Sequence, residues 1–430
     1  MKLATALKRA MGRPVAVPAL LAAALLAALV VAGCGSSSGH TLAASRIRGK
    51  TLTIYVSAPL LGRSDVTGEA VVSGARLALD QVGARIGEYR ISFKALDDAT
   101  AARGGWDPGQ TTINARLAVL DPTTIGYLGE VDSGASAISI PPLNRAGIPQ
   151  VSPTSAAVGL TSDALGAFPG EPQKYYPTGI RTFARVVPDD RVQAIAQVRV
   201  QQSMGCKATF VLNDGEVDGA DAARSFEVAA QAAHLHLAGV ATFVRDATSY
   251  KSLAAGLAHV APDCVLIAAD TESGAVLLTT QIAAAMPDVR IFGTADLAES
   301  TYCDPKDGGI PPSVDPRVVL TSPTLGLNDY PPSARAFNAA YERRYGSPEP
   351  AAIYGYEAMS LLLSAIERAT EDGTRPAVRS EVRAALFATH DRRSVLGTYG
   401  IDRNGDTTLR RYGVWNIVDG ELTYWETIDA

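Results

Sequence analysis

The chain has 430 residues, of which 47% are hydrophobic and 19% are charged, so it can bury the core of more than one globular domain. Its 44 acidic residues outnumber its 39 basic residues, and the formal net charge is −5. This balance argues against nucleic acid as a partner and against electrostatic binding to an anionic membrane surface.

The N-terminus has the layout of an export signal. Four basic side chains precede an apolar run of 17 residues, Val15–Val31, which ends in small residues. The sequence Val31-Ala32-Gly33-Cys34 resembles the lipobox of bacterial lipoprotein signal peptides. We therefore expect residues 1–33 to be removed and Cys34 to be acylated. The alternative is an uncleaved anchor helix, because 17 residues is the lower limit for crossing a bilayer.

Either alternative places the bulk of the chain outside the cytoplasm and close to a membrane. Residues 34–49 begin with a Gly/Ser-rich stretch and are expected to form a tether. Removal of residues 1–33 takes away four positive charges and no acids, so the formal charge changes from −5 to −9.

Short β-branched runs then alternate with amphipathic helical stretches, which predicts parallel sheets with helices on both faces. The first series has expected strands at 52–57, 89–96 and 125–128, and helices at 68–82, 110–120 and 133–144. Residues 161–178 are rich in Gly and Pro, and we expect them to form a surface excursion.

The alternation starts again after this segment. The second series has expected strands at 182–186, 208–212, 237–243, 264–268 and 289–293, and helices at 190–204, 219–233, 250–260 and 274–285. A strand at 318–322 precedes helices at 333–345, 353–370 and 375–388, and an antiparallel pair at 411–418 and 422–425 ends the chain. Two α/β halves are therefore predicted.

The cysteines of the two predicted halves suggest one disulfide. Cys206 and Cys264 lie at the leading ends of two predicted parallel strands, and neighbouring strands would bring their α-carbons within about 5.5 Å. A Cys206–Cys264 bridge with Cys303 free and three free thiols are the two alternatives. We expect no metal site, because the sequence has no CxxC motif and its five histidines are scattered.

Ligands of open parallel sheets bind beyond the carboxyl ends of the strands, where helix amides are free. Residues 129–136 lead from a strand into a helix that Ser133 can cap, and Gly134 lets a ligand approach the backbone. Residues 151–156 end the next strand with small hydroxyl side chains. Each loop alone is typical of an ordinary helix cap or strand exit, whereas the two side by side predict a carboxylate site.

The chain resembles the type I periplasmic binding proteins, specifically the branched-chain amino acid binding family of ABC transporters. The resemblance covers about residues 51–425. Its most specific motifs are Asp132-Ser133-Gly134-Ala135-Ser136, Ala146-Gly147-Ile148-Pro149 and Val151-Ser152-Pro153, with further matches at 183–190, 354–358 and 402–406.

The resemblance implies an α/β fold of two doubly wound parallel-sheet lobes joined by a three-segment hinge. The first lobe would comprise residues 50–185 and 324–394, and the second lobe residues 186–323 and 395–430. Ser133, Thr154, Ser155 and Ala156 match the positions that hold the ligand carboxylate on the first lobe of such proteins, and Gly134 adjoins them as a further candidate.

The second lobe departs from the family pattern. Asp218 stands where a tyrosine is usual, and Ala295 falls where an acid is expected with Asp296 one step later. On the first lobe, Thr67 replaces a frequent aromatic and Ala156 replaces a frequent threonine. Because Asp218, Asp270 and Asp296 all follow second-lobe strands, we expect them to converge on the cleft. They indicate a ligand richer in positive charge or donors than leucine, unless they are solvated or cap helices.

The expected function is a lipid-anchored, monomeric receptor that passes a small amino-acid-like ligand to an ABC permease, with no cofactor and no catalysis of its own. A sensory module of the same fold is the second hypothesis, and an exported hydrolase is the third. The Gly35-Ser36-Ser37-Ser38-Gly39 match to the hydrolase pattern GxSxG lies in the tether, without the strand and helix that this motif needs.

Overall fold

The computed structural model describes residues 46–63 and 65–430. The predicted leader, the acylation site at Cys34 and residues 35–45 lie outside the described residues. Among the helices that are described, none is long and apolar enough to cross a membrane.

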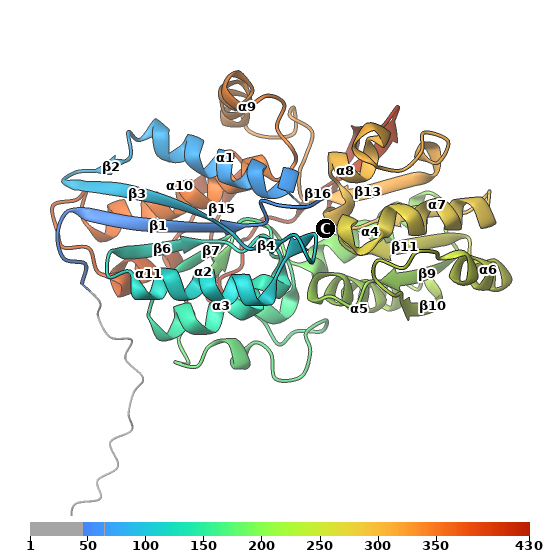
Figure 1. Cartoon of the computed structure of the whole chain (residues 1–430), viewed down its shortest axis with the longest axis horizontal. Coiled ribbons are helices and arrows are strands. Elements are labelled where there is room, and N and C mark those ends of the chain that lie inside the picture. Colours follow the sequence, from blue (N-terminus) through green and yellow to red (C-terminus); the bar gives the residue numbers. More distant parts are fainter. Residues whose placement is uncertain (1–45, 64) are drawn as a thin grey trace, which may run out of the picture. The chain divides into compact units, whose positions relative to one another are not determined.

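A six-stranded sheet organises the first lobe (Figure 1). Its strands, in spatial order, are β2 (Arg85–Ile86), β3 (Tyr89–Asp97), β1 (Thr51–Ala58), β6 (Thr124–Leu128), β7 (Gln150–Ser152) and β8 (Phe183–Arg185). All neighbouring pairs are parallel except β2 with β3.

Helices cover both faces of this sheet because apolar side chains alternate along its strands. Leu52, Ile54 and Val56 of β1 pack in one core with α1 and α10, whereas Tyr55 packs on the opposite face with α2 and α3. The helices of this lobe are α1 (Asp65–Gln81), α2 (Pro108–Leu120), α3 (Ser133–Arg145), α9 (Pro332–Tyr345), α10 (Ala352–Ala369) and α11 (Arg379–Phe387).

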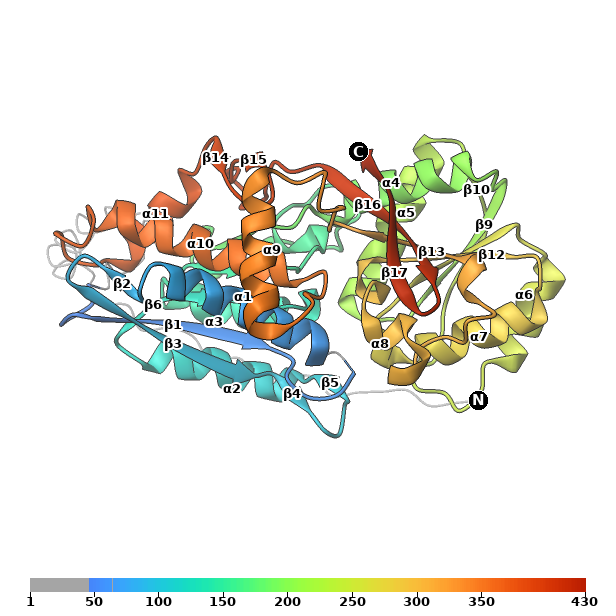
Figure 2. The same ribbon diagram turned by 90° about the horizontal axis from the view of Figure 1, so that it is seen from above.

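A seven-stranded sheet organises the second lobe (Figures 1 and 2). Its strands, in spatial order, are β10 (His236–Thr242), β9 (Ala208–Asn213), β11 (Cys264–Ala268), β12 (Arg290–Gly293), β13 (Val318–Ser322), β16 (Arg411–Val418) and β17 (Glu421–Asp429). The strands from β10 to β13 are parallel, and β16 and β17 complete the sheet in antiparallel fashion.

The same alternation of side chains places helices on both faces of the second sheet. Val265 and Ile267 of β11 pack with α6 and α7, whereas Leu266 packs with α4 and α5. The helices are α4 (Asp190–Ser203), α5 (Val217–Ala232), α6 (Lys251–Val260), α7 (Ala275–Ala285) and the short α8 (Ser300–Cys303). The predicted fold class, two doubly wound α/β lobes, is confirmed.

Three segments connect the lobes: the residues after β8, those after β13, and those between β15 (Thr398–Tyr399) and β16. Arg185, at the end of β8, is fully buried and joins two of these segments through an ion pair with Asp406, at 2.8 Å. Its guanidinium also donates to the carbonyl oxygens of Ser155 and Ala157 at 3.1 and 2.8 Å. Tyr399 and Ile401 still pack in the first core, so the third segment enters the second lobe after them.

Two-residue strands form small ribbons beside the main sheets. They are β4 (Ala99–Thr100) with β5 (Gly105–Trp106), and β14 (Arg392–Arg393) with β15.

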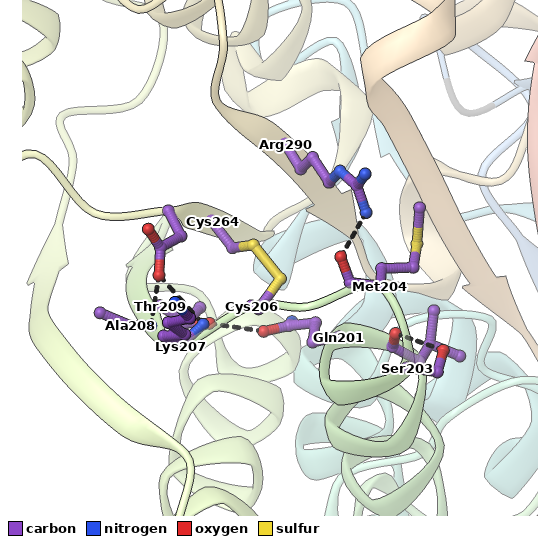
Figure 3. The surroundings of a disulfide bond; sticks show 11 residues. Gln201, Ser203, Met204, Cys206, Lys207, Ala208, Thr209, Cys264 and Arg290 are labelled. Atoms are coloured by element: carbon purple, nitrogen blue, oxygen red, sulfur yellow. Dashed lines mark hydrogen bonds between the residues drawn. A yellow bond between two sulfur atoms is a disulfide. The ribbon is translucent and has the colours of Figure 1, made fainter.

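The Cys206–Cys264 disulfide is present, with an α-carbon separation of 5.9 Å (Figure 3). Cys264 opens β11, and Cys206 precedes the neighbouring strand β9 by two residues, as the strand pattern predicted. Cys303 is free and buried. The bridge therefore ties the amino ends of two strands together, at the edge of the sheet opposite the predicted ligand site.

Two local predictions were wrong. Residues 161–178 are not only a surface excursion, because Tyr175 and Tyr176 are buried against Ile140 and Phe183. Helix α11 begins at Arg379 rather than at Arg375, since the chain before it is extended at Val378, which pairs with Arg46.

Candidate functional site

The carboxyl ends of the strands in both lobes lead into loops that surround one cavity. The first lobe contributes the loops after β6 and β7, and the second lobe contributes those after β9, β11 and β12. Parallel strands expose their carboxyl ends at one edge, so polar loop residues that are distant in sequence gather there. The cavity encloses about 80 Å³.

Acidic side chains dominate the lining of the cavity, and no Lys, Arg or His is among the lining residues. The acidic residues are Asp132, Asp190, Asp218, Asp270, Glu272, Asp296 and Glu299. Thr67, Thr154, Ala156, Gln193 and Tyr412 are among the other residues that face it. The expectation that Asp218, Asp270 and Asp296 converge on the cleft agrees with this arrangement.

Asp218 occupies the N-terminus of helix α3. Its carboxylate accepts hydrogen bonds from the backbone N–H of Ser133, at 2.8 and 3.0 Å, and from that of Gly134, at 3.3 Å. A helix N-terminus attracts a negative group because its first N–H groups have no partner within the helix. The side chain of Asp218, which belongs to the second lobe, therefore occupies the position at the start of α3 that was predicted for a ligand carboxylate.

The prediction that the amides of these two first-lobe loops are free for a ligand was wrong. The N–H groups of Thr154 and Ser155 donate to the hydroxyl of Ser152, at 3.3 and 2.9 Å. The helix begins at Ser133 with Asp132 as its N-cap residue, so Ser133 does not cap it. The Ser133 hydroxyl instead accepts from the N–H of Ala157 at 3.1 Å.

Small hydroxyl side chains stabilise the two first-lobe loops against each other. The Thr154 hydroxyl donates to the Val131 carbonyl at 2.7 Å, and Ser155 lies 2.8 Å from the hydroxyl of Ser136. Thr154 and Ala156 face the cavity, whereas Ser133, Gly134 and Ser155 are buried behind its wall. A side chain at position 134 would also clash with Trp106, whose ring lies 2.5 Å from the position of an added Cβ.

Asp270, like Asp132, lines the cavity and has one buried carboxylate oxygen without a hydrogen-bond partner among the described residues. Asp270 is 5% exposed, and the oxygen concerned is its Oδ2 atom. Burial raises the pKa of Asp270 well above its usual value, and the nearby carboxylates of Glu272 and Asp214 raise it further. The phenol oxygen of Tyr412, on β16, is likewise buried and has no hydrogen-bond partner in the described part of the chain.

Burial also raises the pKa values of other carboxyl groups in this wall. The pKa of Glu299 rises to about 7, chiefly because the side chain is removed from water. The pKa of Asp190 rises well above its usual value because of burial and the neighbouring carboxylate of Asp221. These carboxyl groups therefore hold a proton more readily than usual, and a positive charge bound among them would favour their ionised form.

Direct hydrogen bonds connect the lobes around the cavity. The Thr67 hydroxyl, on α1, donates to Glu299 at 2.6 Å, and the Val158 N–H donates to Asp221 at 2.9 Å. Arg103 of the first lobe pairs with Glu216 of the second at 3.1 Å. The two sets of loops are therefore in contact in this structure.

Four lining acids were missed in the sequence. Asp132 opens the motif at 132–136, Asp190 ends the family-like stretch at 183–190, and Glu272 lies two residues after Asp270. Their closeness in sequence to predicted site residues is a signal that could have found them. Glu299 follows a 3-10 turn after β12, and no local pattern marks it. Among the described residues, no group of three or more potential metal ligands has a suitable arrangement.

The chain is similar in sequence to known solute-binding proteins. The sequence profile of the family described as "Periplasmic binding protein" matches residues 51–421. Leu/Ile/Val-binding protein BraC3 of Rhizobium johnstonii is 26% identical over 210 residues, which are 48% of this chain and 50% of that protein. The matched region thus spans only half the length of this curated relative.

Solved structures share the fold. The leucine binding protein LivK from Thermotoga maritima superposes with a TM-score of 0.75 at 19% identity, over 88% of this chain and 99% of that one. A solute binding protein of an ABC transporter from R. palustris, in complex with benzoate, gives a TM-score of 0.70 at 19% identity, over 88% and 96% of the two chains. At such identities the likeness concerns the fold alone.

Proposed function

This chain belongs to the periplasmic binding protein family, and from that premise we propose that it is an extracytoplasmic solute receptor of an ABC transporter. The ligand is an amino acid or an amino-acid-like compound held between the two lobes. Supporting this proposal, one cavity lies where loops at the carboxyl ends of strands from both sheets meet. That is the position at which open α/β sheets bind small molecules.

The mechanism we propose is closure of a hinge. The three connecting segments allow the lobes to separate, a ligand enters the acidic cavity, and contacts from both lobes stabilise the closed form. The Asp218 and Glu299 hydrogen bonds between lobes would strengthen that form. The permease, rather than this chain, would supply ATP hydrolysis.

A screen of thermal unfolding tests the proposal. The full chain, extracted in detergent, is incubated with amino acids, amides, amines and aromatic acids. A ligand at about 100 times its dissociation constant adds about 2.7 kcal/mol to the free energy of unfolding. We expect at least one compound to raise the melting temperature and to be recovered chemically unchanged. Cells in which the gene is deleted should no longer take up that compound. Recovery of a transformed compound would instead support the hydrolase hypothesis.

We also propose that Cys34 carries a lipid that holds the receptor at the membrane. The Cys34→Ser variant is expected to move from the membrane fraction to the soluble fraction while it keeps its ligand affinity. A variant that stays in the membrane fraction would favour the uncleaved anchor helix.

A further inference from the structure

The strongest clue to the ligand is the carboxylate that the protein places at the start of α3. Asp218 accepts three hydrogen bonds from the N–H groups of Ser133 and Gly134, at 2.8, 3.0 and 3.3 Å. These groups are buried, so a ligand carboxylate cannot share them. A ligand with its own carboxylate would have to displace Asp218 into a wall that is already acidic.

Asp218 itself therefore provides the negative group that the helix N-terminus attracts. What the cavity lacks is positive charge, because its lining includes seven carboxyl side chains and no Lys, Arg or His. Arg103 of the first lobe and Arg245 of the second lobe both pair with Glu216, which does not line the cavity. Arg245 also interacts electrostatically with Asp270 and Glu272, but from outside the cavity lining.

Asp270 provides an independent observation that points to a ligand. Asp270 lines the cavity, and its Oδ2 atom is buried and has no hydrogen-bond partner among the described residues, as is also true of the Oδ2 atom of Asp132. A buried carboxylate without a partner is costly, and a cationic N–H donor would satisfy it. Tyr412 also lines the cavity, and its phenol oxygen is a further buried polar atom without a hydrogen-bond partner among the described residues.

The volume limits the size of the cation. A buried water needs about 10–15 Å³ measured in this way, so a cavity of about 80 Å³ holds roughly half a dozen non-hydrogen atoms. A small unbranched amine has this size. An aromatic acid would exceed it and would bring a second carboxylate to an acidic wall.

We infer that the ligand is a small organic amine that has no carboxylate, because Asp218 fills the place that such a carboxylate would take. This inference rests on the proposed receptor function and replaces the amino acid with a carboxylate-free amine as the ligand class. The ammonium group would lie among Asp270, Asp296 and Tyr412, and Asp218 would remain on α3.

Two compounds that differ only in the carboxylate provide the test. Binding of 1,4-diaminobutane and of ornithine to the full chain is measured by calorimetry, with leucine, benzoate and calcium chloride as further probes. We expect 1,4-diaminobutane to bind at least tenfold more tightly than ornithine, and the other probes to bind more weakly still. Equal or tighter binding of ornithine, leucine or calcium would overturn the inference.

The Asp218→Ala variant tests the role of the internal carboxylate. Removal of this side chain frees the amides of Ser133 and Gly134, so the preference for 1,4-diaminobutane over ornithine should fall at least tenfold. Glu216→Ala is the matched control, because it also removes a carboxylate from an interlobe contact at the start of α5 but outside the cavity. An unchanged preference in Asp218→Ala would overturn the inference.

The outcomes separate this inference from the function on which it depends. Tight binding of leucine with a weak response to amines would leave the receptor function intact and reject only the amine. Failure of amines, amino acids and aromatic acids to bind would reject both.

Discussion

Glu299 allows a quantitative test of the electrostatics of the cavity. This side chain is 5% exposed and accepts hydrogen bonds from the hydroxyls of Thr67 and Thr301, at 2.6 and 2.7 Å. Burial raises its pKa from 4.5 to about 7 in the folded protein. The folded state therefore binds a proton more tightly than the unfolded state, and stability falls as the pH rises.

The magnitude follows from the two pKa values. The contribution of Glu299 is fully present below about pH 4.5 and disappears as the pH rises through about 7. Between about pH 5 and about pH 8 the ligand-free protein should lose about 2.5 kcal/mol of unfolding free energy through this group alone. Glu299→Gln stays neutral throughout, so its stability relative to the wild type should rise by that amount over this range.

Urea unfolding of both proteins at several pH values, without ligand, measures this difference. Glu367→Gln, on the exposed side of α10, is the matched control and should show no such trend. A constant difference between wild type and Glu299→Gln from about pH 5 to about pH 8 would refute the reasoning, because the carboxyl group would then titrate alike in both states.

Three further variants test the supports of the fold. Asp406→Ala leaves the buried Arg185 without its ion-pair partner and should lower the free energy of unfolding, measured with denaturant, by about 3–5 kcal/mol. A decrease below about 1 kcal/mol would contradict an ion pair shielded from water. Replacement of Cys206 and Cys264 by serine removes a cross-link between residues 58 positions apart and should lower the free energy of unfolding by up to about 4 kcal/mol. Titration of three free thiols in the unreduced wild type would reject the disulfide. Gly405 has a φ of +103°, and an added Cβ would lie 2.1 Å from a backbone oxygen. Gly405→Ala should therefore lower the free energy of unfolding by at least about 2 kcal/mol in the same assay. The decrease should exceed that of Gly346→Ala, where an added Cβ meets no atom within 4 Å.

The sequence predicted most of the sheet architecture, because buried parallel strands leave short apolar runs between helical periods. The pairing of Cys206 with Cys264 followed from the same pattern once two such runs were taken as neighbours. Asp218 and Asp270 could be placed at one cleft because both follow strands whose carboxyl ends share an edge. These inferences needed only local pattern and sheet geometry.

Contacts between the lobes could not be predicted in this way. The hydrogen bond between Thr67 and Glu299 joins residues that are 232 positions apart and belong to different sheets. The occupation of the α3 N-terminus by Asp218 depends in the same way on how two lobes meet. The burial of Tyr175 and Tyr176 was missed because Gly and Pro dominated the local composition.

Arg185 has a consequence for how the segments between the lobes can move. Its guanidinium holds Asp406 of one connecting segment and the backbone oxygens of Ser155 and Ala157, beside the wall of the cavity. Two of the three connections therefore cannot twist independently, and the loop at 154–157 is carried along when they turn. Any motion of the molecule that keeps these bonds would move Asp406 and the loop at 154–157 together with β8.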